Sequence, residues 1–178
     1  MSVLMRRLYP AFKSSVPFVH CGAWDRPGVF VAAMALTLLG VLPEPSNVRD
    51  QATGPAAQFW DKAWPHVLLG LTASELAALF WEVRLGVQPQ QLAVDHLGRL
   101  TSKALVRNQA LLLTEGRERA VLVAGVEGVQ QGHRFEAEAL LLLDPTKPTA
   151  SLESVPLAEC EHQFDGAVVV GRSPTNRR

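Results

Sequence analysis

Asp144 is the residue whose surroundings most favour a chemical role. It follows Glu138 and an uninterrupted run of five apolar residues, and Pro145 stops the run immediately after it. Such a run between turn signals is typical of a buried strand, which would hold the Asp144 carboxylate at a fixed place. A carboxylate held in this way can orient a neighbouring catalytic group. The pattern also fits a plain strand-end aspartate before a turn proline.

Two cysteines, Cys21 and Cys160, are the possible thiol nucleophiles. They form neither a disulfide framework nor a Cys-x-x-Cys metal pair, and free thiols indicate a reducing compartment. For Cys160, which follows the Asp144 strand in a short predicted helix, the sequence offers no catalytic partner. An ordinary buried thiol is therefore the simplest interpretation of both.

The five histidines do not have the spacing of a metal site. No His-x-x-x-His or similar ligand pair occurs, so we expect no metal. We also expect no cofactor, because the chain lacks a Gly-x-Gly-x-x-Gly sequence and a P-loop. His133 follows Gln131-Gly132 and is predicted to lie in a solvated hairpin turn. The others are scattered: His20, His66, His96 and His162.

Three helices are predicted in the first half of the chain. Val29–Leu39 is apolar on nearly every side, which indicates a central buried helix that Pro27 begins and Gly40 ends. Ala56–Val67 has one apolar face that includes Trp60 and Trp64; exposed tryptophans there would mark a partner surface. Thr72-Ala-Ser-Glu75 is a capping box that starts the third helix, with Gly86 as its stop.

The second half has the short apolar runs of a sheet. A short helix at Leu157–Phe164 precedes the last strand, and residues 1–26 are expected to be irregular. Because helices come before a mostly antiparallel sheet, the order predicts an α+β fold. The hairpin loop between the third and fourth strands is assigned to Gly128–Gly132. The predicted strands are Gln91–Val94, Ala110–Thr114, Ala120–Val126, Ala137–Leu143 and Ala167–Val170.

Composition limits the function classes. At 178 residues, with 48% hydrophobic and 19% charged residues, the chain has the length and composition of one globular domain. Lys+Arg and Asp+Glu are both 17, so the chain has no net positive charge that would favour nucleic-acid binding. The apolar runs are too short to span a bilayer.

The order of these elements resembles one type of papain-like cysteine peptidase: the double-glycine leader peptidases of bacterial peptide exporters and the proteases that process the ubiquitin-fold modifier. In those families a helix beginning Cys-Gly-(x)5-Met-x-Leu precedes a strand His-x-Val-Val-x-x-Gly and a strand ending Asp-Pro. Here the matching segments cover about residues 16–171. They are Pro27-Gly28 with Met34 and Leu36, Arg119-Ala-Val121-Leu-Val-Ala-Gly125, and Leu143-Asp144-Pro145.

The resemblance implies a fold without its usual chemistry. Pro27 stands at the nucleophile position and Arg119 at the general-base position, and only Asp144 matches the family pattern. Proline has no nucleophilic atom, and a guanidinium with a pKa above about 12 cannot accept a proton near neutral pH. Cys21 occupies the position of a residue that often lines the oxyanion hole. In this alignment we expect a buried ion pair between Arg119 and Asp144 across adjacent strands.

A second interpretation keeps an active enzyme. His20-Cys21-Gly22 would fit the Cys-Gly start if the helix began there, but Pro27 would then interrupt the first turns. The chain would in that case be a cysteine hydrolase or isopeptidase that uses Cys21.

The main hypothesis is a non-catalytic, pseudo-peptidase domain that binds a protein or extended peptide, with Trp24, Arg119 and Asp144 as binding residues. It could equally be a subunit of a larger hetero-oligomeric complex. We divide the chain into an N-terminal arm (1–15), one papain-like domain (16–171) and a C-terminal tail (172–178). The expected location is intracellular and cytoplasmic. A mitochondrial one is the alternative, since residues 1–24 are basic and contain no acid.

Overall fold

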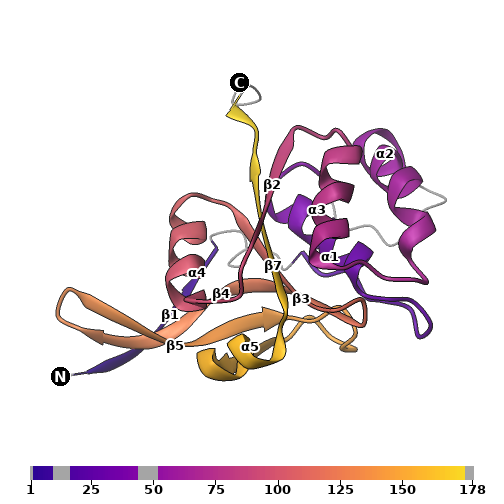
Figure 1. Ribbon diagram of the computed structural model, residues 1–178. Helices are drawn as coiled ribbons and strands as arrows, with labels where there is room; N and C mark the ends of the chain where they lie inside the picture. Colours follow the sequence, from indigo (N-terminus) through magenta and orange to yellow (C-terminus); the bar gives the residue numbers. More distant parts are fainter. Residues whose placement is uncertain (1, 10–16, 44–51, 175–178) are drawn as a thin grey trace.

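A computed structural model describes residues 2–9, 17–43 and 52–174, which fold into a mixed helix-and-sheet structure (Figure 1). Within these ranges there are five α-helices and a seven-stranded antiparallel sheet. The α+β class is therefore confirmed. The helices are α1 (Gly28–Leu38), α2 (Gly54–Ala63), α3 (Ala73–Glu82), α4 (Leu97–Val106) and α5 (Leu157–Gln163). The strands are β1 (Val3–Leu8), β2 (Val87–Leu92), β3 (Ala110–Glu115), β4 (Arg119–Gln131), β5 (Arg134–Leu143), β6 (Leu152–Pro156) and β7 (Gly166–Arg172).

Helix α1 is the buried helix that its composition predicts. All of its residues except Thr37 are buried, and the hydroxyl of Thr37 donates to the carbonyl oxygen of Ala33, 2.9 Å away. The only polar side chain of α1 therefore has its hydrogen-bond partner in the same helix. Apolar residues therefore face the sheet on one side of α1 and the other helices on the opposite side.

The next two helices follow the sequence prediction with one change. Helix α2 ends at Ala63, and Trp64–His66 forms a 3-10 turn instead of a further α-helical turn, since Pro65 cannot donate a main-chain hydrogen bond. Helix α3 begins with the predicted capping box. Glu75 N–H donates to Thr72 Oγ1 (3.3 Å), and Thr72 N–H donates to Glu75 Oε2 (2.9 Å).

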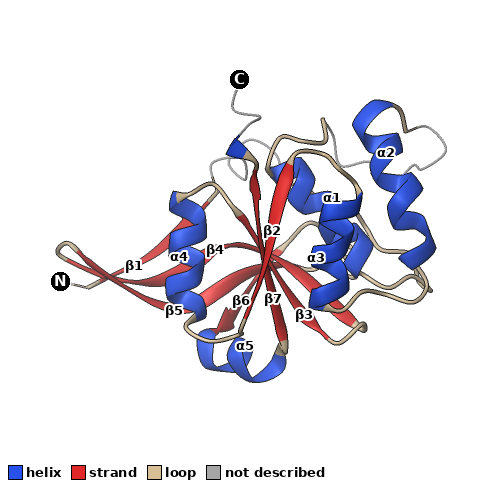
Figure 2. Cartoon of the chain, turned by 45° about the horizontal axis from the view of Figure 1, so that its top comes forward, coloured by secondary structure: helices blue, strands red, loops and turns tan. Residues whose placement is uncertain are grey.

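The sheet separates two groups of helices (Figure 2). Its strand order is β2-β7-β3-β4-β5-β6, and β1 pairs with β4 beyond the end of β3. Alternate residues of β3 belong to different clusters: Leu112 packs with α1–α3, and Leu111 and Leu113 pack with α4 and α5. This alternation is the period-two pattern of a strand that is buried on both faces.

Five elements differ from the sequence prediction. The strand expected at Gln91–Val94 is β2, which begins four residues earlier and spans Val87–Leu92. The expected irregular N-terminus is wrong for Val3–Leu8, which form β1, and strand β6 and helix α4 were not expected. The expected hairpin loop Gly128–Gly132 is also wrong, because β4 continues to Gln131 and the turn is Gly132-His133. Gly128 lets the main chains of β4 and β5 approach closely, because a Cβ atom on it would overlap the carbonyl oxygen of Glu136 on β5.

The predicted segment boundaries are only partly covered. Residues 10–15 of the N-terminal arm, residues 44–51 of the loop after α1 and residues 175–178 of the C-terminal tail lie outside the described residues. In the ranges that the structure describes, no helix has both the length and the apolar character needed to cross a membrane.

Candidate functional site

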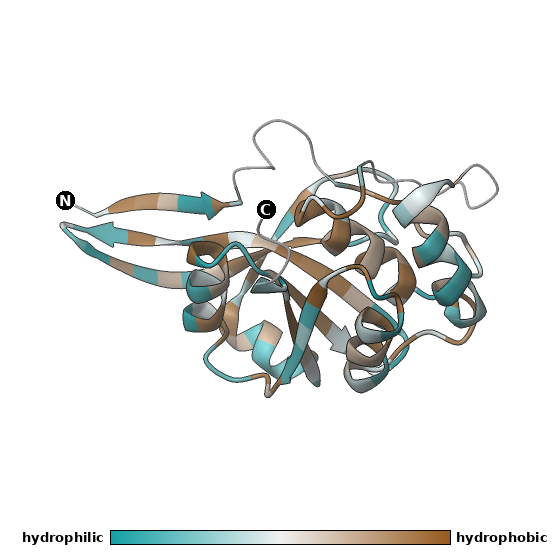
Figure 3. Ribbon diagram, turned by 90° about the horizontal axis from the view of Figure 1, so that it is seen from above, coloured by the Kyte–Doolittle hydropathy of each residue, from teal (hydrophilic) through white to brown (hydrophobic). Residues whose placement is uncertain are grey.

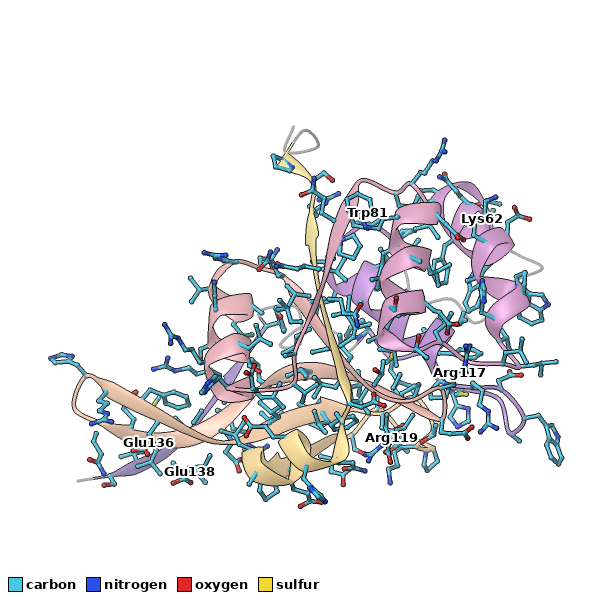
Figure 4. All side chains as sticks on the ribbon, viewed as in Figure 1. Lys62, Trp81, Arg117, Arg119, Glu136 and Glu138 are labelled. Atoms are coloured by element: carbon cyan, nitrogen blue, oxygen red, sulfur yellow. The ribbon has the colours of Figure 1, made fainter. Side chains whose placement is uncertain are left out.

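Four segments that are distant in sequence meet at one end of the sheet. The loop before α1 is joined to the end of β5 by a hydrogen bond from Cys21 N–H to Pro145 O, 2.7 Å long. The same loop is joined to the turn before α3 by Arg26 N–H and Val67 O, also 2.7 Å apart. The β3–β4 turn completes the group, and Figure 4 shows Arg117 and Arg119 at this end of the molecule, away from Trp81. Of the predicted site residues, Cys21, Arg119 and Asp144 are thus brought together.

Gly70 allows this close packing. Its φ is +74°, a conformation that favours glycine, and a Cβ atom would overlap the carbonyl oxygen of Arg117 and lie 3.0 Å from Arg26 Cβ. The turn before α3 can therefore lie directly against both arginine-bearing loops.

The predicted ion pair between Arg119 and Asp144 is present. Arg119 Nε lies 3.6 Å from Asp144 Oδ2, and the two side chains are 24% and 5% exposed. The Arg119 guanidinium also lies 5.3 Å from the centre of the Phe164 ring, within cation–π range. Asp144 Oδ1 accepts hydrogen bonds from the Thr146 N–H (2.9 Å) and hydroxyl (2.6 Å). Both carboxylate oxygens of Asp144 are therefore engaged.

The mixed-charge run Arg117-Glu118-Arg119 is fully paired as well. Glu118 forms an ion pair with Arg26, and Arg117 Nη2 lies 2.5 Å from Glu75 Oε1. The hydrogen bond from the Thr72 main chain lowers the pKa of Glu75, and Arg117 lowers it further. These pairs join three loops to one another. The run is therefore no open anion site.

Pro27 occupies the N-cap of α1. It has helical backbone angles, and its carbonyl oxygen accepts the first helical hydrogen bond, from Val31 N–H at 3.0 Å. The side chain is buried. Its neighbour Arg26 contacts Glu118, which precedes Arg119, so the helix start and the start of β4 are adjacent. No atom of the Pro27 side chain can act as a nucleophile.

Cys21 has the surroundings of an unreactive thiol. The side chain is buried, and the sulfur donates to the carbonyl oxygen of Asp25 at 3.0 Å. Burial, together with the negative charges of Asp25 and Asp144, raises its pKa from its ordinary value of 9.0 to about 11. A cysteine nucleophile needs the opposite shift. Among the hydrogen bonds of the described residues, those of the Cys21 thiol go to main-chain oxygens and not to a histidine.

The second cysteine is similar. Cys160 is fully buried in α5, and burial raises its pKa to about 11. As predicted, His133 lies in the β4–β5 turn. Among the described residues, no group of three or more His, Cys, Asp or Glu side chains has the arrangement of a metal site.

Exposed apolar side chains lie beside these loops. Trp24 is 89% exposed, and Leu68 and Leu69 are also exposed in the turn that Arg26 contacts. We call Trp24, Leu68 and Leu69 the loop patch. Trp60 is buried, whereas Trp64 is 40% exposed. The sequence prediction identified Trp24 but not the leucines; the signal was two adjacent apolar residues between a helix end and Gly70.

The described surface also has hollows away from this end. One of about 420 Å³ is lined by Trp81, Gln88, Gln109 and Arg172, among others. Another of about 560 Å³ lies beside α4 and is lined by residues including His96, Arg99 and Lys103. Neither includes a residue of the predicted site. The site is therefore built on loops and not around either hollow.

In sequence comparisons, no protein-family model and no curated protein matches this chain. The arrangement of residues 21–28, 117–119 and 144 thus carries the functional interpretation.

Proposed function

We propose that this chain is a papain-like domain without peptidase chemistry, and that it binds a protein or an extended peptide at the loop end of the sheet. The observation that carries the proposal is the Arg119–Asp144 ion pair. In the resemblance to leader peptidases, Asp144 would orient a histidine at position 119. Here its oxygens are engaged by a guanidinium and by Thr146.

The chemistry of the three positions supports the loss of activity. A peptidase of this type needs a thiolate to attack and an imidazole to carry the proton. Arg119 stays protonated at neutral pH, and Pro27 has no nucleophilic atom. The raised pKa of Cys21 keeps the nearest thiol protonated as well.

The loop patch supports binding. Trp24, Leu68 and Leu69 extend from loops that are joined by main-chain hydrogen bonds and ion pairs, so little conformational freedom is lost when a partner binds. Exposed tryptophans in such positions are frequent binding hot spots. Because Arg26, Arg117 and Arg119 already have carboxylate partners, an apolar and uncharged peptide segment fits this surface best.

The alternative is an active cysteine hydrolase or isopeptidase that uses Cys21. Its supporting feature is the carboxylate of Asp144 near this cysteine. A peptide probe with a thiol-reactive group separates the two functions. We expect no labelling of the wild-type chain; stoichiometric labelling that is lost in Cys21→Ala would replace the proposal with the hydrolase.

Binding is tested by selection from a random peptide library displayed on phage. We expect enriched apolar peptides whose affinity falls at least tenfold in Trp24→Ala. Trp81→Ala is the matched control, because Trp81 is also exposed but lies near the end of α3, away from Arg117 and the turn before that helix (Figure 4). Peptides that bind both variants as tightly as the wild type would contradict a binding site at the loop patch.

A further inference from the structure

Three strands extend away from the helices as an arm (Figure 3). The arm consists of β1, residues 125–131 of β4 and residues 134–139 of β5. Strand β1 runs from the hairpin end, where Val3 pairs with Gln130, toward the body, where Leu8 pairs with Gly125. The arm therefore carries β1 along one side, with its N-terminal end farthest from the body.

Strand β1 has a free edge. Among the described strands it pairs with β4 alone, so the main-chain groups on its other side have no strand partner. The two other outer strands carry residues that oppose pairing: Pro89 within β2, and Glu153 and Pro156 within β6. Neither a proline nor an acidic residue is present in β1. Its two charged residues, Arg6 and Arg7, contact β4 and β5 of its own sheet, so its edge is the least protected of the three.

The apolar residues of β1 are exposed while its charges are satisfied. Val3, Leu4 and Met5 all have large exposed fractions, with Leu4 at 64%. Arg6 Nε lies 2.7 Å from Glu127 Oε2, and the Arg7 guanidinium lies 3.9 Å from the centre of the Phe135 ring. Both arginines are therefore held over the arm. They do not need a partner chain for their charge.

We propose that a second copy of this chain covers the edge, by antiparallel pairing of β1 with β1 around a two-fold axis at Leu4. In this register Leu4 lies opposite Leu4 of the partner and Val3 lies opposite the partner's Met5. Apolar side chains then meet, and Arg6 lies opposite Ser2. A parallel, in-register pairing would instead place Arg6 and Arg7 beside their own copies, which is unfavourable.

The direction of β1 supports the same geometry. Because β1 points toward its own body, an antiparallel partner has its body beyond the hairpin end of the first arm. The two bodies then lie at opposite ends of the joined arms. A parallel partner would bring both bodies to the same end. The interface is isologous, as in most dimers with two-fold symmetry, and closes after two copies.

Sedimentation of the full chain tests the dimer. We expect a species of twice the monomer mass, and at least a tenfold increase in dimer dissociation constant for Leu4→Arg, which places like charges opposite each other. Val106→Arg is the control, since Val106 is 89% exposed but lies at the end of α4 and outside the proposed β1 interface. A monomeric wild type, or a dimer equally stable in Leu4→Arg and Val106→Arg, would overturn the proposal.

A disulfide tests the register. Opposite residues of an antiparallel pair have Cα atoms about 4.5–5.5 Å apart, within the range of a disulfide. Leu4→Cys should therefore form a covalent dimer on mild oxidation, and Val106→Cys should not. Cys21 and Cys160 are buried, so the background is low. Equal cross-linking of both variants would refute pairing at Leu4.

Discussion

Arg119 and Asp144, from the start of β4 and the end of β5, form an ion pair with 3.6 Å between Nε and Oδ2. The pair lies beside the loop that leads into α1, since Cys21 N–H donates to Pro145 O. Arg119, Asp144 and the loop before α1 therefore lie at the same end of the sheet. An arginine can only hold the carboxylate and the loops in place.

Replacement of Asp144 should separate the two roles of its carboxylate. Asp144→Asn keeps an acceptor for Thr146 N–H but removes the charge beside Arg119, and Asp144→Ala removes both. We expect Asp144→Ala to lower the free energy of unfolding by about 1–3 kcal/mol, and Asp144→Asn to lower it less. Urea titration measures both, with Asp61→Asn on the exposed side of α2 as the control.

A second substitution tests whether the charge matters. Arg119→Met combined with Asp144→Asn should recover part of the loss, because the uncompensated guanidinium is gone. If Asp144→Asn is as stable as the wild type, the ion pair makes no net contribution to the free energy of unfolding.

Because of the capping box of α3, we expect replacement of Thr72 to lower stability more than replacement of Thr53. Thr72→Ala removes the hydroxyl that accepts from Glu75 N–H and should cost about 1 kcal/mol. Thr53 is the N-cap of α2 but makes no side-chain cap bond, so Thr53→Ala should leave the unfolding midpoint nearly unchanged. Equal shifts in the two variants would contradict this assignment of the cap.

The burial of α1 predicts that a charge inside it prevents folding. Met34 is fully buried, and Met34→Asp would place a lone carboxylate there, at a penalty close to the whole stability of a small domain. We expect loss of the cooperative melting transition by circular dichroism. Met34→Leu, a similar volume, should cost less than about 1.5 kcal/mol. A normal transition in Met34→Asp would reject the central position of α1.

The raised pKa values of the two cysteines lead to a prediction about how stability depends on pH. Burial raises the pKa of each thiol from 9.0 to about 11, so the native state keeps protons that the unfolded chain releases. The contribution of the two protonated thiols to the free energy of unfolding is complete below pH 9. It is lost as the pH rises through about 11. Stability should therefore fall in this window. The fall should be smaller in Cys21→Ala with Cys160→Ala, and equal slopes would contradict the raised values.

Local signals predicted the parts of the fold that depend on local chemistry. The capping box Thr72–Glu75, the apolar helix before Gly40 and the strand that ends at Asp144-Pro145 all lie where the sequence places them. The Arg119–Asp144 pair was also expected, but from the resemblance to the peptidases and not from a local signal.

Elements stabilised by distant residues were not predicted. Helix α4 has no usual N-cap: His96 has a φ of +50°, and the N–H of Leu97 donates to Glu161 Oε1 of α5, 3.1 Å away. Strand β1 exists through its pairing with β4, more than 100 positions later. Gly128 suggests a turn in the sequence, but it allows β5 to approach closely.

The proposal of a papain-like domain implies that positions 27, 119 and 144 correspond to a Cys-His-Asp set. It is tested most directly by introducing the missing groups, in Pro27→Cys with Arg119→His, and measuring the pH dependence of thiol alkylation. A thiol at a helix N-terminus beside an imidazole has a lowered pKa. We expect a pKa at position 27 well below 8.5 that rises when Asp144→Asn is added. An ordinary pKa that does not respond to Asp144→Asn would contradict the claim.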